Sequence, residues 1–264
     1  MNTMLLGKTI VVTGASSGIG ARTAELAIAQ GADVIGVDIR EPAAPQANFI
    51  AGDLSNPAGI AAVVDRMPQR VDAVLNVAGV SGVIGAERTL AINFYGLRAF
   101  SEAIAPKIRE GGSVVNVASI AGYGWRANLA RAKAMVGVEG FPDIAAVIAA
   151  NGVNNEEGYP LSKELLLLWT MMAAHQPLFK SRGIRVNAVS PGPVETQILK
   201  EFRSVLGDAK VNSDIDRVGR AGNASDIAPV VLFMASDAAR WINGANIAND
   251  GGLEASINAD VLGF

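Results

Sequence analysis

The sequence predicts a single α/β domain, residues 1–264, built on a doubly wound parallel sheet of about seven strands with helices on both faces. Short, apolar, β-branched segments alternate with longer helical patterns along most of the chain. This rhythm is typical of buried parallel strands joined by helical crossovers. The chain has 264 residues, of which 50% are hydrophobic, and that is enough for one domain with a substantial core.

Composition narrows the expected partners before any motif is considered. The net charge is −3 and there is no long basic run, so neither nucleic acid nor a membrane surface is expected as a partner. Cysteine is absent, which excludes disulfides and thiolate metal sites and fits a reducing cytosol. Residues 1–8 lack the apolar core of a signal peptide, and no apolar run has the length of a membrane span. We expect a cytoplasmic protein without a metal ion.

A glycine-rich turn follows the first predicted strand, residues 9–13, and opens a helix that runs to Gln30. Glycines let the backbone approach a phosphate closely, and the N–H groups and dipole of a helix start attract an anion. The spacing is Gly14-x-x-x-Gly18-x-Gly20, which differs from the common Gly-x-Gly-x-x-Gly fingerprint. The alternative is a tight turn without a ligand, but the strand–turn–helix context favours a pyrophosphate site.

The second predicted strand, residues 33–38, ends in an acid that bears on the choice of nucleotide. Asp38 lies 18 residues after Gly20, where a carboxylate accepts hydrogen bonds from a ribose 2′-hydroxyl and repels a 2′-phosphate. Asp38 therefore favours NAD(H). Arg40 follows two residues later, and an arginine there leaves NADP(H) as the alternative.

The alternation continues through the middle of the chain. Strands are predicted at residues 49–54, 73–76 and 113–119, and helices at residues 57–67 and 86–108. Asn93 lies inside the second helix, where its side chain competes with the backbone, and its alternative interpretation is a solvent-facing residue. Ser119 ends the last of these strands, at the edge where open parallel sheets bind ligands.

The alternation of strands and helices is interrupted between residues 122 and 157. Two helices are predicted there, at residues 128–138 and 142–151, and a connection this long indicates an inserted lid or interface element. A helix at residues 161–180 and a strand at residues 184–189 follow. Residues 193–220 are more polar and lack clear periodicity, so we expect a mobile flap. A helix capped by Ser225 and a strand at residues 245–248 close the pattern, and no role is assigned to the tail after Gly252.

Tyr159 and Lys163 are spaced so that one helix face carries both side chains. A phenol with the ordinary pKa of about 10 is a poor acid or base at neutral pH. A nearby ammonium stabilises the phenolate and lowers that pKa, which makes a tyrosine usable for proton transfer. Alone, this spacing is more often a surface pair; the other motifs of the chain are what favour the catalytic interpretation.

Taken in order, these motifs make the chain resemble the classical short-chain dehydrogenase/reductase family, with its Rossmann-type fold, over essentially its whole length. The matching motifs are Thr13-Gly14-x-x-x-Gly18-x-Gly20, Asp53-Leu54, Asn76-Val77-Ala78-Gly79, Asn93, Ser119, Tyr159-x-x-x-Lys163 and Pro191-Gly192.

The resemblance implies a role for each matching residue. Tyr159 would exchange a proton with the substrate oxygen, Ser119 would hold that oxygen, and Lys163 would lower the Tyr159 pKa and bind the nicotinamide ribose. Asn93 would anchor a water that relays protons to Lys163. NAD would be bound by these residues: Gly14, Ser16, Ser17, Gly18, Ile19, Gly20, Asp38, Ile39, Asp53, Leu54, Asn76, Ala78, Gly79, Tyr159, Lys163, Pro191, Gly192, Val194 and Thr196. Hydride transfer itself is cofactor chemistry.

Ser119 and Tyr159 are 40 positions apart, far wider than is usual in the family. This insertion makes the chain similar to the bacterial 3α-hydroxysteroid dehydrogenase/carbonyl reductase subgroup. The resemblance implies interconversion of a hydrophobic secondary alcohol and its ketone, with a 3α-hydroxysteroid as the specific expectation. A cyclic terpenoid or aryl alcohol is the alternative substrate. A non-catalytic NAD(H)-binding sensor is the alternative of another class, and sugar-nucleotide epimerisation would need a larger C-terminal domain.

The insertion also bears on assembly. Family members usually associate through the helices that carry Asn93 and Tyr159, and inserted helices are expected to cover that surface. Contact through the helix at Ser225 and the strand around Ile247 would then give a two-fold homodimer.

Overall fold

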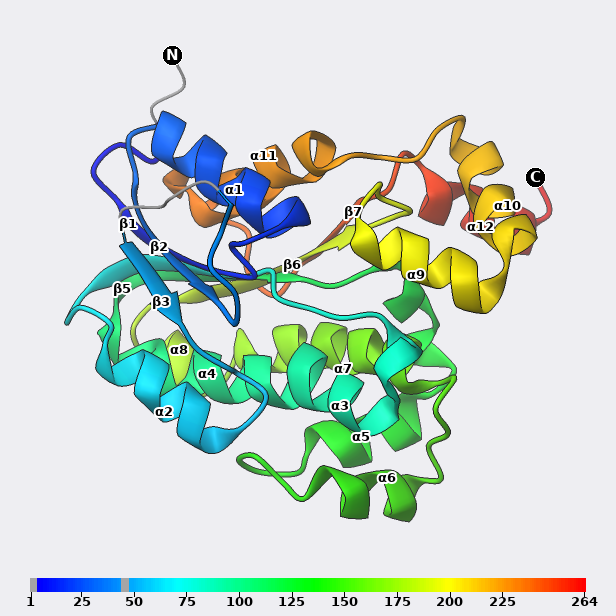
Figure 1. The fold of residues 1–264 in the computed structure, drawn as a ribbon, viewed down its shortest axis with the longest axis horizontal. Coiled ribbons are helices and arrows are strands. Elements are labelled where there is room, and N and C mark those ends of the chain that lie inside the picture. The colour runs from blue at the N-terminus through cyan, green and yellow to red at the C-terminus, as the bar shows by residue number, and fades with distance from the viewer. Residues whose placement is uncertain (1–3, 44–47) are drawn as a thin grey trace.

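The fold is a seven-stranded sheet with a layer of helices on each face (Figure 1). The computed structural model describes residues 4–43 and 48–264, so the first three residues of segment 1–8 lie outside the described part. All strand pairs are parallel, in the order β3-β2-β1-β4-β5-β6-β7. The strands are β1 (Thr9–Thr13), β2 (Asp33–Asp38), β3 (Asn48–Ala51), β4 (Val71–Asn76), β5 (Ile108–Val117), β6 (Arg185–Pro191) and β7 (Asn246–Asn249). The predicted fold class is confirmed.

The central strands are apolar throughout because both of their faces are covered. Along β1, Ile10 and Val12 join the core beneath α1 (Gly18–Ala29) and α11 (Ala224–Ala235), while Val11 joins the opposite core. Figure 1 shows α1 and α11 on one side of the sheet and the other layer on its far side. That second layer consists of α2 (Pro57–Asp65), α3 (Ala86–Leu90), α4 (Leu97–Ile104) and α7 (Gly158–Ala173). Within the described residues, no helix combines the length and apolarity of a membrane span.

The strand order reverses between β1 and β4, and this reversal positions the site. β1 pairs with β2 on one side and with β4 on the other. The connections that leave β1 and β4 therefore diverge to opposite sides and open a crevice at the carboxyl ends of the strands. Gly14 follows β1 there, and Val77 follows β4.

The helix predicted at residues 86–108 ends earlier than expected, and its middle is irregular. Its middle is a π-helical turn, Ala91–Gly96, between α3 and α4, and Ile108 already belongs to β5. A Cβ on Gly96 would lie 2.0 Å from the carbonyl oxygen of Leu54, so this turn packs directly on the segment after β3. Such π-turns are frequent at functional sites.

Residues 193–220, predicted as a flap from a sequence without clear periodicity, are largely helical. They contain α9 (Gln197–Leu206) and α10 (Asp208–Val218). The tail forms α12 (Leu253–Leu262). The predicted helix at residues 161–180 divides into α7 and α8 (Pro177–Lys180), because proline is tolerated in the first turn of a helix but not in its interior. The cap of α11 is Asn223, in a capping box with Asp226, rather than Ser225.

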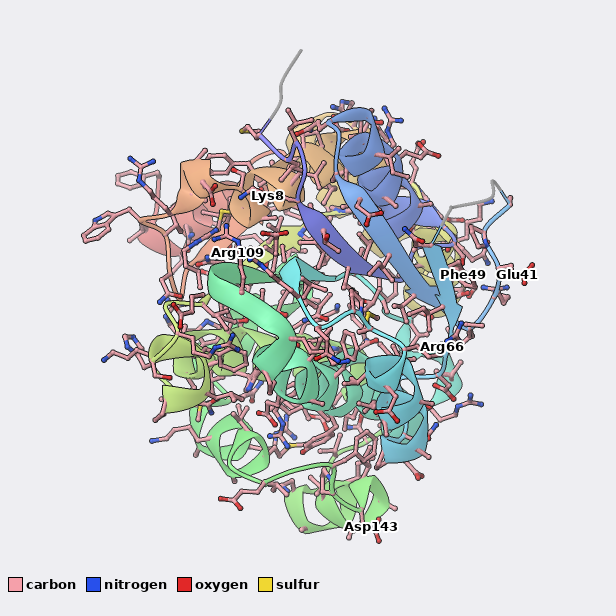
Figure 2. All side chains as sticks on the ribbon, turned by 90° about the vertical axis from the view of Figure 1, so that its left-hand side faces the viewer. Lys8, Glu41, Phe49, Arg66, Arg109 and Asp143 are labelled. Atoms are coloured by element: carbon pink, nitrogen blue, oxygen red, sulfur yellow. The ribbon has the colours of Figure 1, made fainter. Side chains whose placement is uncertain are left out.

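The insertion forms two helices, as predicted, α5 (Leu129–Val136) and α6 (Ile144–Asn151), and they pack on α7 and α3. Arg98 of α4 ties the insertion down: it is 3% exposed and donates hydrogen bonds to the carbonyl oxygens of Val136 (3.0 Å) and Gly140. The hydroxyl of Tyr95 donates to the carbonyl of Met135. Figure 2 shows Asp143, the cap of α6, at the outer edge of the molecule. The insertion therefore covers the outer side of the helices that carry Asn93 and Tyr159.

Candidate active site

A cavity of about 100 Å³ lies at the carboxyl ends of β4, β5 and β6. It collects residues predicted from widely separated motifs: Ile19, Gly79, Ser119, Tyr159, Lys163, Pro191, Gly192, Val194 and Thr196. The fold thus brings the three predicted catalytic side chains other than Asn93 to one cavity wall.

Tyr159 stands in the first turn of α7 and faces Ser119, which follows β5. Burial raises the pKa of the Tyr159 phenol above its ordinary value, and a hydrogen bond with the Ser119 side chain partly lowers it again. Burial penalises the charged form of any acid, whereas a hydrogen bond to the phenolate favours it. Ser119 is itself fixed, since its Oγ accepts a hydrogen bond from the amide of Ala121 at 3.1 Å. The pair can therefore hold and move a proton at the phenol oxygen.

Lys163 lies one turn further along α7 and is 5% exposed. Its Nζ donates a hydrogen bond to the carbonyl of Val117 at 3.0 Å and stands 5.7 Å from the centroid of the Tyr159 ring. Burial lowers the pKa of this ammonium to about 8. The expected lowering of the Tyr159 pKa by Lys163 stays a prediction, because in the structure burial dominates both groups.

Asn93 is buried in the π-helical turn and is not the solvent-facing residue of the alternative interpretation. Its amide accepts from the backbone N–H of Val80 and donates to the carbonyl of the same residue, both at 2.9 Å. It also donates to the hydroxyl of Ser162. Asn93 therefore fixes the segment after β4 against α7. Its role in anchoring a relay water stays a prediction.

The glycine turn fits a dinucleotide pyrophosphate. Gly14 has φ +70°, and a Cβ there would lie 2.8 Å from Ala78 Cα. A Cβ on Gly20 would lie 2.0 Å from the Gly14 carbonyl oxygen. The α1 start has no side-chain cap from Ser17 and no acidic residue in its first turn. A helix start with these properties leaves its backbone N–H groups and its positive dipole end for an anion.

Asp38 lies at the mouth of this turn, as the sequence predicts. Its two carboxylate oxygens accept hydrogen bonds from the backbone N–H groups of Ser16 (3.1 Å) and Arg40 (3.2 Å). The hydroxyl of Ser16 donates to the Arg40 carbonyl. These bonds hold the carboxylate beside the anion site, where it can accept from a ribose. Ile39 is 67% exposed, and exposed Asp53 accepts from the amide of Ser55.

Asn76 faces the core rather than the cavity. Its amide donates to the hydroxyl of Ser101 and to Asn116, at 2.8 and 2.9 Å, so it joins β4 to β5 and α4. Thr13, which is part of the glycine motif but was given no role from the sequence, also joins two segments. Its hydroxyl accepts hydrogen bonds from the N–H groups of Val77 and Ala78, both at 3.0 Å. This bridge sets the Val77–Ala78 backbone against the glycine turn.

The residues that sequence reasoning missed come mainly from α9. Ile198, Leu199 and Phe202 line the cavity from above, and the Phe202 ring packs edge-on against the Tyr159 ring, with centroids 4.7 Å apart at 70°. Phe202 lies three residues after Leu199 and four after Ile198, and this spacing is the apolar stripe of an amphipathic helix. This spacing is the sequence signal that could have predicted α9 and the face that it buries.

Comparison with known proteins agrees with this geometry. The family profile described as short chain dehydrogenase matches residues 8–142, and the profile described as enoyl-(acyl carrier protein) reductase matches residues 143–254. A coniferyl-alcohol dehydrogenase of Pseudomonas sp. (strain HR199 / DSM 7063) is 41% identical over 249 residues, which cover 94% of this chain and 97% of that protein.

Two solved structures share the fold over nearly the whole chain. One is a 3-alpha-hydroxysteroid dehydrogenase from Pseudomonas sp. B-0831 complexed with NADH (TM-score 0.82, 28% identity, 95% of this chain and 98% of that one). The other is a short chain dehydrogenase from Burkholderia cenocepacia J2315 in complex with NADP (TM-score 0.72, 27% identity, 95% and 99%). Fold, site and matches together show that the chain belongs to the short chain dehydrogenase family, as a short-chain alcohol dehydrogenase.

Proposed function

We propose that the chain oxidises an aryl alcohol of the coniferyl alcohol type with NAD⁺. The observation that carries this is the apolar part of the cavity lining, which includes Ile198, Leu199 and the ring of Phe202 against Tyr159. Such a lining suits a flat, largely apolar substrate. The 41% identity to a coniferyl-alcohol dehydrogenase supports the aryl alternative over the steroid expectation.

Each residue of the site has a separate role in the proposed reaction, set by its position. When bound, the nicotinamide supplies the hydride acceptor. Ser119 donates to the alcohol oxygen and holds it beside Tyr159, which takes the hydroxyl proton in its phenolate form. Lys163 supplies positive charge on the same helix face, 5.7 Å from the Tyr159 ring centroid. The low exposure of Lys163 and the cover of Phe202 exclude water from the proton that moves.

NAD⁺ is the proposed cofactor because of Asp38. Its carboxylate lies beside the Ser16 amide at the mouth of the glycine turn, where it would accept from a 2′-hydroxyl and repel a 2′-phosphate. We expect Asp38→Asn to lower kcat/KM with NAD⁺ and to raise it with NADP⁺, changing the ratio about 10- to 100-fold, because Arg40 then meets less opposing charge. Steady-state kinetics with both cofactors measure the ratio. An unchanged ratio would remove Asp38 from the selection.

A 3α-hydroxysteroid remains the second candidate, since the solved structure at TM-score 0.82 is of a 3-alpha-hydroxysteroid dehydrogenase. Absorbance of the reduced nicotinamide, with NAD⁺ or NADP⁺ supplied against coniferyl alcohol, cinnamyl alcohol, cyclic terpene alcohols and a 3α-hydroxysteroid, separates the two. We expect the highest kcat/KM with coniferyl alcohol and NAD⁺. Preference for the steroid would reverse the ranking, and NADH binding without any turnover would favour the sensor.

We also propose a homodimer that leaves the outer side of α4 and α7 unused. Arg98 and the insertion already occupy part of that surface, so α11 and β7 are the proposed contact. Analytical ultracentrifugation over a dilution series tests this, and a tetramer that persists at low concentration would contradict it.

A further inference from the structure

Residues 193–220, here called the flap, cover the phenol of Tyr159. Phe202 of α9 packs on the Tyr159 ring, and Leu199 beside it is 8% exposed. The cavity between α9 and Tyr159 is partly open and has a volume of about 100 Å³, well below the roughly 300–1,000 Å³ of small-molecule sites. Figure 1 shows α9 lying over the end of α7. An aryl alcohol therefore needs more room at Tyr159 than this position of α9 leaves.

One polar contact holds α9 to the body of the domain on the substrate side. The hydroxyl of Ser81 donates a hydrogen bond to the carboxylate of Glu201. Among the described side chains of α9, Glu201 is the one with a hydrogen bond to a residue outside the flap. The side chains of Arg203 and Ser204 form hydrogen bonds with residues of the flap itself. Glu201 precedes Phe202, so the contact lies beside the ring that covers Tyr159.

Ser81 is a rigid anchor for this contact. It is fully buried, and its carbonyl accepts from the hydroxyl of Thr89 at 3.4 Å. The preceding residue, Val80, is held at both its N–H and its carbonyl by Asn93. Glu201, in contrast, is carried by a helix whose remaining contact with the site is apolar. Motion at this contact is therefore motion of α9.

The other end of the flap has a separate tether. Arg217 of α10 donates to Asp260 (2.7 Å) and to Ser256 (2.9 Å), both on α12. This ion pair is largely exposed, with side-chain exposures of 37% and 59%, and such pairs contribute little. It provides a matched comparison because it restrains α10 without touching Phe202 or Tyr159.

We propose that Ser81 and Glu201 form a clasp that keeps α9 closed over Tyr159, which makes Glu201 a positioning residue for the reaction. The proposal rests on the proposed function, in which Tyr159 is the reacting acid/base. A hydrogen bond from a neutral donor to a partly exposed carboxylate is strong enough to favour closure and weak enough to open in each turnover. We expect its loss to shift the closed-to-open ratio about 5- to 30-fold.

Limited trypsin digestion of the full chain, with fragments identified by mass spectrometry, measures opening directly. Lys200 and Arg203 place two cleavage sites on α9. We expect Glu201→Ala and Ser81→Ala each to speed cleavage there about 5- to 30-fold. The double variant should be no faster than either single one, and Glu201→Gln, which keeps an acceptor oxygen, should recover part of the protection. Asp260→Ala should leave cleavage at Lys200 and Arg203 unchanged.

Kinetics supply the second readout. Loss of the clasp should lower KM for the alcohol by up to a similar factor and leave kcat within about twofold, because the free protein then opens at a smaller cost before the alcohol enters. Cleavage rates equal to wild type, or effects that add in the double variant, would overturn the clasp. The digestion needs no substrate, so a failure of the alcohol assay would count against the proposed function and leave the clasp standing.

Discussion

The two sides of the active site are built on different principles. The glycine turn and the segment after β4 are joined backbone to backbone: Gly14 and Gly20 leave no room for a Cβ, and Thr13 binds two consecutive N–H groups. The described part of α9 contacts the site through side chains, with the Phe202 ring on Tyr159 and the Glu201 carboxylate on Ser81. The nucleotide side is therefore preformed, whereas the substrate side can open.

This difference fits the ligand proposed for each side. A pyrophosphate is recognised by backbone N–H groups, whose directions are set by the fold. An apolar alcohol has to pass into a water-excluding space and leave it again, which requires a cover held by contacts that are individually weak. Substitutions should therefore act on stability and nucleotide affinity on one side, and on substrate KM and flap motion on the other.

Tyr159→Phe tests the point where the two sides meet, and we expect the largest effect there. The variant keeps the ring on which Phe202 packs but loses the group that takes the proton. We expect kcat/KM to fall about 10³-fold or more, because general acid–base catalysis contributes roughly 10²–10⁴-fold. NADH binding, followed by fluorescence, should be largely retained, because the glycine turn and Asp38 are intact. Tyr123→Phe, which loses only a bond to Asn258, is the control; comparable losses in both variants would contradict the assignment.

Gly20→Ala should distort the glycine turn proposed to bind the nucleotide. The added Cβ would stand 2.0 Å from the Gly14 carbonyl oxygen, so the turn must move. We expect the free energy of unfolding to fall by about 3 kcal/mol, with weaker NADH binding. Denaturant titration and fluorescence measure the two effects.

Gly222→Ala, at the base of the flap, is the matched substitution, because its Cβ would meet nothing closer than 3.6 Å. It should change stability by less than about 0.5 kcal/mol. Equal losses in the two variants would remove the distinction between a preformed and a movable side.

Ser119→Ala tests how Ser119 affects the pKa of Tyr159. The Ser119 hydrogen bond lowers the Tyr159 pKa against the effect of burial. Its removal should therefore shift the alkaline rise of alcohol oxidation to higher pH. We expect kcat/KM at pH 7 to fall about 10²-fold, as for other single oxyanion donors. Ser113→Ala, in the middle of β5 with its hydroxyl donating to the carbonyl of Ala235, should leave the pH profile in place. A lower midpoint in Ser119→Ala would contradict the proposed direction.

Lys163→Met should increase the stability of the folded chain, and this effect should be the smallest of the four substitutions considered in this comparison. Burial lowers the Lys163 pKa from 10.5 to about 8, so burying the charge costs stability below pH 8. Between pH 8 and 10.5 the unfolded chain binds the extra proton, and wild type gains stability as pH rises. Allowing for the lost bond to Val117, the variant should be more stable by about 2 kcal/mol at pH 7 and should lose this advantage toward pH 10.5.

Denaturant titrations at several pH values measure this difference. Lys107→Met is the control, since Lys107 donates to the carbonyls of Val64 and Met67 at the end of α2 and should lose stability on replacement. A Lys163→Met variant that is less stable than wild type at pH 7 would show that the ammonium is fully compensated in the folded chain.

Sequence reasoning succeeded where the relevant contacts are short in sequence. The glycine turn, Asp38 and the Tyr159–Lys163 pair are each read within one strand–turn–helix unit or one helical turn, and the structure places them at one crevice. It failed for the π-helical turn, because the irregular backbone around Asn93 is stabilised by Val80 and Ser162, 13 and 69 residues away. The two helices of the flap were missed because the apolar stripe of α9 is short and lies between polar residues.

By itself, the sequence determined the parallel fold, and it predicted the anion site and the acid/base pair, because local spacing and strand burial are sufficient to indicate them. Tertiary structure alone decided the direction of the Tyr159 and Lys163 pKa values, since both depend on burial by elements distant in the chain. It also decided that Ser81 meets Glu201 across 120 residues. No local propensity encodes such a contact; it exists because packing of α9 on the body brings a buried hydroxyl and a flap carboxylate to the same place.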